Sequence, residues 1–118
     1  AMVLPIWDAD PAIAEAERRK IIDQIDWECA ENLARHITNQ VSFGKHTLEM
    51  MAYGTGSLPL VGTPRDVAEG LAELYRRGID GVLMSYIDYY EDTLRFERDV
   101  LPILRELGVR PADASAVA

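Results

Sequence analysis

The chain has 118 residues, of which 48% are hydrophobic, and its 12 basic and 20 acidic residues give a formal net charge of −8. This composition is typical of one globular domain and excludes a disordered tail. The acidic balance leaves no positive field for phosphates or anionic lipids, so we expect neither a nucleic-acid partner nor a membrane partner.

The start of the chain and its cysteine content indicate a cellular compartment. Residues 1–10 have no basic stretch followed by a long apolar run, as a secretory signal would. Cys29 has no second cysteine with which to form an internal disulfide, so we predict a reducing, cytoplasmic environment. No apolar stretch approaches the roughly 20 residues that a membrane helix needs.

The first part of the chain predicts one strand followed by helices. The apolar run VLPIW at residues 3–7 is typical of a strand buried on both faces, although Pro5 cannot donate to a ladder. The Asp-Pro pair at residues 10–11 predicts the start of a helix that continues to about residue 25. Asp26 is expected to cap a second helix with the sequence WECAENLARHI.

The middle of the chain predicts a turn-rich connector with one short helix over His46–Tyr53. The run GTGSLPLVGTP at residues 54–64 is interpreted as a loop because of its glycines and prolines. Free N–H groups at the end of this loop could hold a phosphate. However, the run matches neither G-x-G-x-x-G nor a P-loop, and Asp66 would repel an anion, so simple helix capping is the favoured interpretation.

The last part predicts a helix, a strand and a final helix. Thr63-Pro64-Arg65-Asp66 combines a capping residue, a proline at the first helical position and an acidic residue at the third. GVLMSY at residues 81–86 is typical of a short buried strand. The final helix is expected to follow Asp88, to end at Gly108 and to be kinked by Pro102.

Two strands separated by a helical crossover favour parallel pairing. Two parallel strands alone would leave their hydrogen-bonding edges open. We therefore expect a mostly helical piece of an α/β fold that takes its missing strands from other copies of itself or from the rest of a longer protein. The domain is expected to span residues 3–110, followed by a frayed tail at residues 111–118.

Several motifs follow one another at spacings seen in a known family. Gly-Thr-Pro at residues 62–64 starts a helix, Arg-Gly-Ile-Asp-Gly at 77–81 leads into a strand, and Leu-Pro-Ile-Leu at 101–104 lies in the last helix. IWDADPAIAEAE and DWECAENL, earlier in the chain, add to the match. Together these motifs resemble the C-terminal end of the bacterial luciferase-like flavin monooxygenases, which include alkanesulfonate and pyrimidine monooxygenases, although Arg77 stands where alanine is usual.

The resemblance implies a (β/α)8 TIM barrel, of which this chain would hold the last two strand–helix units and the helical insertion between them. It implies an enzyme that uses reduced FMN and oxygen on a small organic substrate, with most flavin contacts in the missing N-terminal barrel. We therefore expect the chain alone to be inactive and to bind no flavin tightly. A deazaflavin-dependent reductase of the same superfamily, and a non-catalytic oligomerisation module derived from the barrel end, remain open. We also expect a homo-oligomer.

In a barrel the chemistry lies at the carboxyl ends of the strands. The pocket-lining candidates are therefore Trp7 and Asp8 after the first strand, and Ser85, Tyr86 and Asp88 after the second. The resemblance implies that an aromatic such as Tyr86 could exclude water from a peroxyflavin. The alternative is that Tyr86 covers the core and keeps its hydroxyl in solvent.

The remaining polar residues predict no further site. His36 and His46 are too far apart for one helical face and, with Cys29, make no metal-binding spacing, so we expect no metal. Cys29 is interpreted as a small buried hydrophobe. The acidic clusters are interpreted as solvated helix faces; they contain Glu15, Glu17, Glu91 and Asp92.

Overall fold

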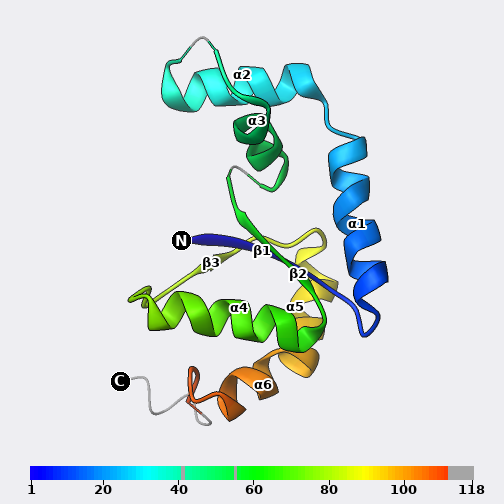
Figure 1. Ribbon diagram of the computed structural model, residues 1–118, viewed down its shortest axis with the longest axis vertical. Helices are drawn as coiled ribbons and strands as arrows, with labels where there is room; N and C mark the ends of the chain where they lie inside the picture. The colour runs from blue at the N-terminus through cyan, green and yellow to red at the C-terminus, as the bar shows by residue number, and fades with distance from the viewer. Residues whose placement is uncertain (41, 55, 112–118) are drawn as a thin grey trace.

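The structure is a computed structural model that describes residues 1–40, 42–54 and 56–111 (Figure 1). The tail predicted at residues 111–118 lies, apart from Pro111, outside the described residues. Helices account for 58% of the structure, which confirms a mostly helical chain. The elements in chain order are β1 (Met2–Trp7), α1 (Pro11–Asp23), α2 (Trp27–Thr38), α3 (Lys45–Ala52), β2 (Leu58–Gly62), α4 (Pro64–Arg76), β3 (Leu83–Met84), α5 (Tyr89–Asp99) and α6 (Leu101–Glu106).

The three strands form one parallel sheet in the order β2-β1-β3. β1 pairs with β2 over five residues, from Val3 opposite Leu58 to Trp7 opposite Gly62. Its ladder with β3 contains only two residue pairs. Parallel pairing is thus confirmed, whereas the prediction of two strands is wrong, because a third strand lies at Leu58–Gly62 within the predicted loop.

The missed strand, LPLVG, is flanked by glycines and contains a proline, which locally favour a loop. It becomes a strand because β1 supplies a complete ladder and the side chains of both strands pack against helices. The strand predicted over residues 81–86 is shorter than expected and contains only Leu83 and Met84.

Pro5 lies in the central strand without interrupting a ladder. The amides of Leu83 and Ser85 donate to the carbonyls of Ala1 and Val3 at 2.8 and 2.7 Å, so alternate residues of β1 face β3. Pro5 is the next residue on that side, and β3 has ended at Met84. Its missing N–H therefore costs the sheet no bond.

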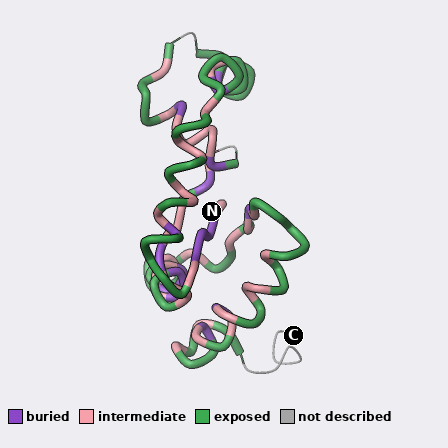
Figure 2. The backbone as a smooth tube through the Cα atoms, turned by 90° about the vertical axis from the view of Figure 1, so that its right-hand side faces the viewer, coloured by how far each residue is buried: buried purple, intermediate pink, exposed green. Residues whose placement is uncertain are grey.

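Helices cover both faces of the sheet. Because successive side chains of β1 point to opposite sides, this strand contributes to a core on each face. Val3 and Trp7 pack against α4 and α6 through a core that contains Val67, Ala68, Leu71, Val100 and Leu104. Leu4 and Ile6 pack on the other face, against Ile21 and Ile22 of α1 and against Tyr53. The purple segment near the N-terminus in Figure 2 is this buried strand between its helices.

Helices α2 and α3 form an arm that extends from α1, on the far side of the sheet from α4 (Figure 1). The arm has its own small core, in which Ala30 and Ala34 meet Leu48. Asp26 caps α2 as predicted and accepts a hydrogen bond from the amide of Cys29 at 2.9 Å. The Cys29 side chain is exposed, so its predicted burial is wrong: it lies about 100° around the helix from Ala30, off the packed face.

The predicted boundaries of the C-terminal helices are confirmed. Thr63 accepts a hydrogen bond from the amide of Asp66, and Asp66 accepts one from the amide of Thr63, which completes a capping box at the start of α4. The last helical segment breaks at Val100, with Pro102 in the first turn of α6. Val100 is fully buried, so the break also places a core side chain.

The described residues thus form an open three-stranded α/β sheet with helices on both faces. A (β/α)8 barrel has eight strands and an outer ring of helices. The three strands are consistent with part of such a barrel. Among the described helices, none has both the length and the hydrophobicity to cross a bilayer.

Candidate functional site

The carboxyl ends of β1 and β3 bring together three of the five predicted site residues. Trp7, Asp8 and Asp88 line one hollow of about 400 Å³, whose floor is formed by apolar side chains such as Ile6 and Ile13. We call this hollow the strand-end pocket. Ser85 and Tyr86 line a different hollow, of about 530 Å³, beside β3. The candidates therefore divide into two groups.

Trp7 is held in the strand-end pocket by three side chains of α5. Its indole N–H donates to Asp99 Oδ2 at 3.1 Å, the edge of Phe96 meets its ring at a centroid distance of 6.0 Å, and the Arg95 guanidinium lies 4.7 Å from the ring centroid. An aromatic ring with a cation on its face and a hydrogen bond at its edge has little rotational freedom. We call these contacts the Trp7 clamp.

Arg95 joins the clamp to the backbone of β1. It donates to the carbonyl oxygen of Trp7 at 3.0 Å and to Asp92 Oδ1 at 3.0 Å. Asp92 also accepts from the amide of Asp88 at 3.1 Å. The Asp92 side chain is only 13% exposed, so its prediction as part of a solvated helix face is wrong.

The acidic groups of the pocket are already engaged by the protein. Asp88 caps α5 by accepting from the amides of Tyr90 and Glu91, both at 3.0 Å. Asp8 accepts from the amide of Asp10 at 2.9 Å. The hydrogen bonds from Arg98 and, more weakly, from Trp7 lower the pKa of the Asp99 carboxyl below its usual range. The pocket is thus an apolar hollow with an acidic rim.

Tyr86 packs beside the clamp. Its ring meets those of Tyr89 and Phe96 edge-on, at centroid distances of 5.8 and 6.2 Å. Burial, and then the negative charge of Asp92, raise the pKa of the Tyr86 phenol. This half-buried position fits both interpretations of Tyr86, as a pocket wall and as a cover of the core.

Ser85 has a structural environment. It is buried, and its hydroxyl lies 3.0 Å from that of Ser57, which donates to the carbonyl of Gly54 at 2.9 Å. This pair joins the end of β3 to the loop ahead of β2. Ser85 is therefore occupied by a contact within the protein rather than presented to the strand-end pocket.

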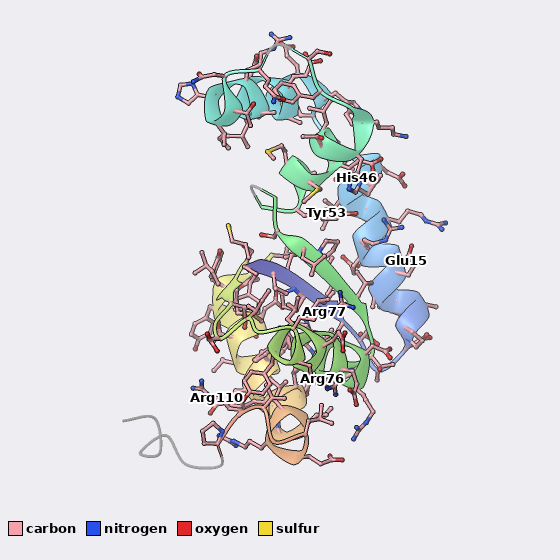
Figure 3. All side chains as sticks on the ribbon, turned by 60° about the vertical axis from the view of Figure 1, so that its left-hand side comes forward. Glu15, His46, Tyr53, Arg76, Arg77 and Arg110 are labelled. Carbon is pink, nitrogen blue, oxygen red and sulfur yellow. The ribbon has the colours of Figure 1, made fainter. Side chains whose placement is uncertain are left out.

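The other polar candidates lie away from the strand ends. Figure 3 shows His46 on the arm and Glu15 on α1. Glu15 is paired with Arg18, whose hydrogen bond lowers the pKa of the Glu15 carboxyl, and Arg18 also donates to the Tyr53 hydroxyl at 3.2 Å. Within the described residues no three metal-ligating side chains gather in one place.

Neither the strand-end pocket nor the start of α4 suits the phosphate of FMN. Such a group needs cations or free backbone N–H groups. The strand-end pocket offers only Arg95, which Asp92 and the carbonyl of Trp7 already engage. The start of α4 is occupied by the carboxylate of Asp66, in agreement with the predicted capping role of this loop.

Sequence reasoning missed the three clamp residues of α5 and Asp92, which pairs with one of them. Asp92, Arg95, Phe96 and Asp99 recur at helical spacings of three and four, so they share one face. That spacing was available in the sequence, but the charges on this face suggested contact with solvent. Trp7 lies 88 residues before Arg95, so no local pattern indicated their contact.

The fold and the site define a mixed α/β protein in which an apolar pocket with an acidic rim lies at the carboxyl ends of parallel strands. Comparison with models of known protein families finds no match. The chain is 31% identical, over 115 aligned residues, to an FMNH(2)-dependent dimethylsulfone monooxygenase of Pseudomonas putida; the match covers 89% of this chain. It is 32% identical, over 86% of its length, to an enzyme of the same name from Pseudomonas fluorescens. It spans about a third of each relative, 32% and 30%.

Proposed function

We propose that this chain is the C-terminal part of a luciferase-like, flavin-dependent monooxygenase, whose complete barrel uses reduced FMN and oxygen to oxidise a small organic substrate. The observation that carries the proposal is the 31% identity to the Pseudomonas putida enzyme across nearly the whole chain. The order of the Gly-Thr-Pro, Arg-Gly-Ile-Asp-Gly and Leu-Pro-Ile-Leu motifs supports it. A cytoplasmic location is part of the same proposal.

In this proposal the strand-end pocket is one wall of the substrate site. Trp7 excludes water from this pocket and Tyr86 excludes it from the neighbouring hollow beside β3, while the clamp on α5 keeps the Trp7 ring in one orientation. Asp8 and Asp88 shape the rim and repel anions. We assign no flavin contact to the described residues, because their charges do not suit the phosphate; those contacts come from the remainder of the enzyme.

Two experiments test the proposal. The 118-residue chain is titrated with FMN while flavin fluorescence is followed, and we expect no submicromolar complex. In the second experiment, this chain replaces the matching third of the Pseudomonas putida enzyme, and the chimera is assayed with reduced FMN, oxygen and dimethylsulfone. We expect a folded chimera that binds flavin and consumes the sulfone, whereas the enzyme truncated before that third does neither.

A matched pair of substitutions tests the pocket wall within the chimera. Tyr86→Ala opens the wall and should lower the yield of oxidised substrate per reduced FMN consumed, because water reaches the reacting centre. Tyr90→Ala is the control, since that residue is 73% exposed and lines neither the strand-end pocket nor the hollow that Tyr86 lines. A chimera that folds but binds no flavin contradicts the family assignment; equal coupling in both variants contradicts only the role of Tyr86.

A further inference from the structure

A further apolar hollow lies between α1 and the arm that α2 and α3 form. It has a volume of about 480 Å³, and apolar side chains of all three helices line it, namely Ile21, Leu33 and Met51, together with Ile25 from the turn after α1. We call this hollow the arm cleft. Its described lining contains no strand residue, so its shape does not depend on what pairs with the edges of the sheet.

The arm cleft is continuous with the strand-end pocket. Glu17 of α1 and Ile87, three residues after β3, line both hollows. The strand-end pocket measures about 400 Å³ and the arm cleft about 480 Å³. Sites of about 300–1,000 Å³ typically enclose a drug-sized ligand. The two hollows together therefore have room for a molecule much longer than dimethylsulfone.

The charged groups around the arm cleft are unsuited to an ionic ligand. Lys20, the one cation among the described residues that line it, is paired with Glu17. Asp26 accepts the capping hydrogen bond from the amide of Cys29 at 2.9 Å. An ionic ligand would have to displace one of these bonds, whereas an apolar chain gains free energy when the apolar walls remove it from water. The lining therefore favours a neutral, apolar group.

We propose that the arm cleft binds the unbranched alkyl chain of a neutral substrate whose reacting end lies in the strand-end pocket. The proposal rests on the function proposed above and names the class of substrate. An unbranched chain suits the site because it can bend past Ile87, which is 61% exposed, from one hollow into the other. Full burial of one methylene strengthens binding about fourfold, so an open cleft should give about two- to threefold for each methylene.

The rate at which iodoacetamide alkylates Cys29 tests the proposal in the 118-residue chain. Cys29 is exposed, lines the arm cleft and is the sole cysteine of the sequence, so its alkylation reports on this hollow. Saturating hexyl methyl sulfone should slow the reaction at least about threefold, and dimethylsulfone at the same concentration should not. The concentration that gives half protection should fall about two- to threefold for each methylene between butyl and hexyl. A rate that is independent of chain length overturns the proposal.

Two apolar residues of α2 provide matched variants. Leu33, which is 36% exposed, lines the arm cleft, whereas Ile37, which is 53% exposed and lies one turn further along the helix, does not. Leu33→Asn should weaken protection by hexyl methyl sulfone about fivefold, and Ile37→Asn should leave it unchanged. Ile87→Asn is a second variant with the same expected loss, and circular dichroism verifies that each variant folds. Unchanged protection in Leu33→Asn and Ile87→Asn, or equal losses in Leu33→Asn and Ile37→Asn, overturns the proposal.

The chimera with the Pseudomonas putida enzyme separates this proposal from the proposed function. In the chimera, Leu33→Asn should raise the KM for hexyl methyl sulfone, relative to the KM for dimethylsulfone, about fivefold, and Ile37→Asn should not change this ratio. A chimera that oxidises dimethylsulfone but not hexyl methyl sulfone overturns the alkyl-chain site and leaves the proposed function intact. A folded chimera that binds no flavin, while hexyl methyl sulfone still protects Cys29 in the 118-residue chain, contradicts the proposed function alone.

Discussion

Replacement of Arg95 by methionine removes the guanidinium at the centre of the Trp7 clamp while it keeps an unbranched apolar stem. The guanidinium donates to the carbonyl of Trp7 and to Asp92, both at 3.0 Å, and lies 4.7 Å from the Trp7 ring centroid. Its loss leaves the Asp92 carboxylate, which is 13% exposed, without its cation. All three effects destabilise the native state.

The expected loss follows from these contacts. A hydrogen bond with a charged partner contributes about 1.5–3 kcal/mol and a cation–π contact about 0.5–1 kcal/mol. The Arg95 side chain is 37% exposed, so solvent screens part of the stabilisation that these contacts provide. We expect Arg95→Met to lower the free energy of unfolding by about 2 kcal/mol, or the melting temperature by about 8 °C. Arg95→Lys keeps the charge but not the planar fork, so we expect about half the loss.

Urea unfolding followed by tryptophan fluorescence measures the effect. The chain has two tryptophans, so a Trp27→Phe background makes the emission report Trp7 alone. Arg105→Met is the matched control, because Arg105 is an exposed arginine of α6 whose side chain makes no hydrogen bond or ion pair to another described residue. No measurable loss is expected there. An unchanged midpoint in Arg95→Met, or equal losses in both variants, would refute the clamp.

Three further predictions concern stability, each measured by thermal or urea unfolding. Gly62 has φ +146°, and a Cβ there would lie 2.6 Å from Asp66 Oδ2. Gly62→Ala should therefore lower the free energy of unfolding by about 2–3 kcal/mol. Gly81→Ala, where a Cβ would meet no atom within 4 Å, should change it very little, and equal effects of the two substitutions contradict this reasoning. Ser57→Ala leaves the buried hydroxyl of Ser85 without its partner and should lower the free energy of unfolding by about 1–2 kcal/mol. In the double variant, Ser85→Ala should add less than its full single-variant loss, because the two hydroxyls interact. Additive losses would show that the hydroxyls are uncoupled. The capping bonds from Thr63 lower the pKa of the Asp66 carboxyl in the folded chain. The stability that this carboxylate contributes is therefore complete above its unfolded pKa of about 3.9 and is lost as the pH falls through its lower folded pKa. Asp66→Asn should make the free energy of unfolding less dependent on pH in this acidic range, and an unchanged pH dependence would contradict the capping role.

The helix starts were predictable from the sequence because capping is local. Asp10, Asp26, Thr63 and Asp88 each accept a hydrogen bond from an amide two or three residues ahead. Such bonds depend on a side chain and the first helical turn, which a short stretch of sequence contains. The break at Val100, two residues before Pro102, was predictable for the same reason, since a proline cannot donate the helical bond.

The positions of the candidate site residues were predictable only in part. The rule that chemistry follows the ends of strands placed Trp7, Asp8 and Asp88 in one pocket. It could not show that Ser85 is paired with Ser57, because the loop that carries Ser57 comes 28 residues earlier. Nor could it separate Asp92, whose side chain is largely covered, from its neighbour Glu91, which stays exposed.

The sequence by itself determined where helices begin and end, the apolar character of β1 and the family that the motifs resemble. The tertiary structure alone decided that LPLVG is a strand, that β1 lies between β2 and β3, and which side chains hold Trp7. The physical reason is the reach of the interactions. A cap is closed by the next turn of chain, whereas a parallel ladder or the hydrogen bond from Trp7 to Asp99 needs partners that only the folded chain brings together.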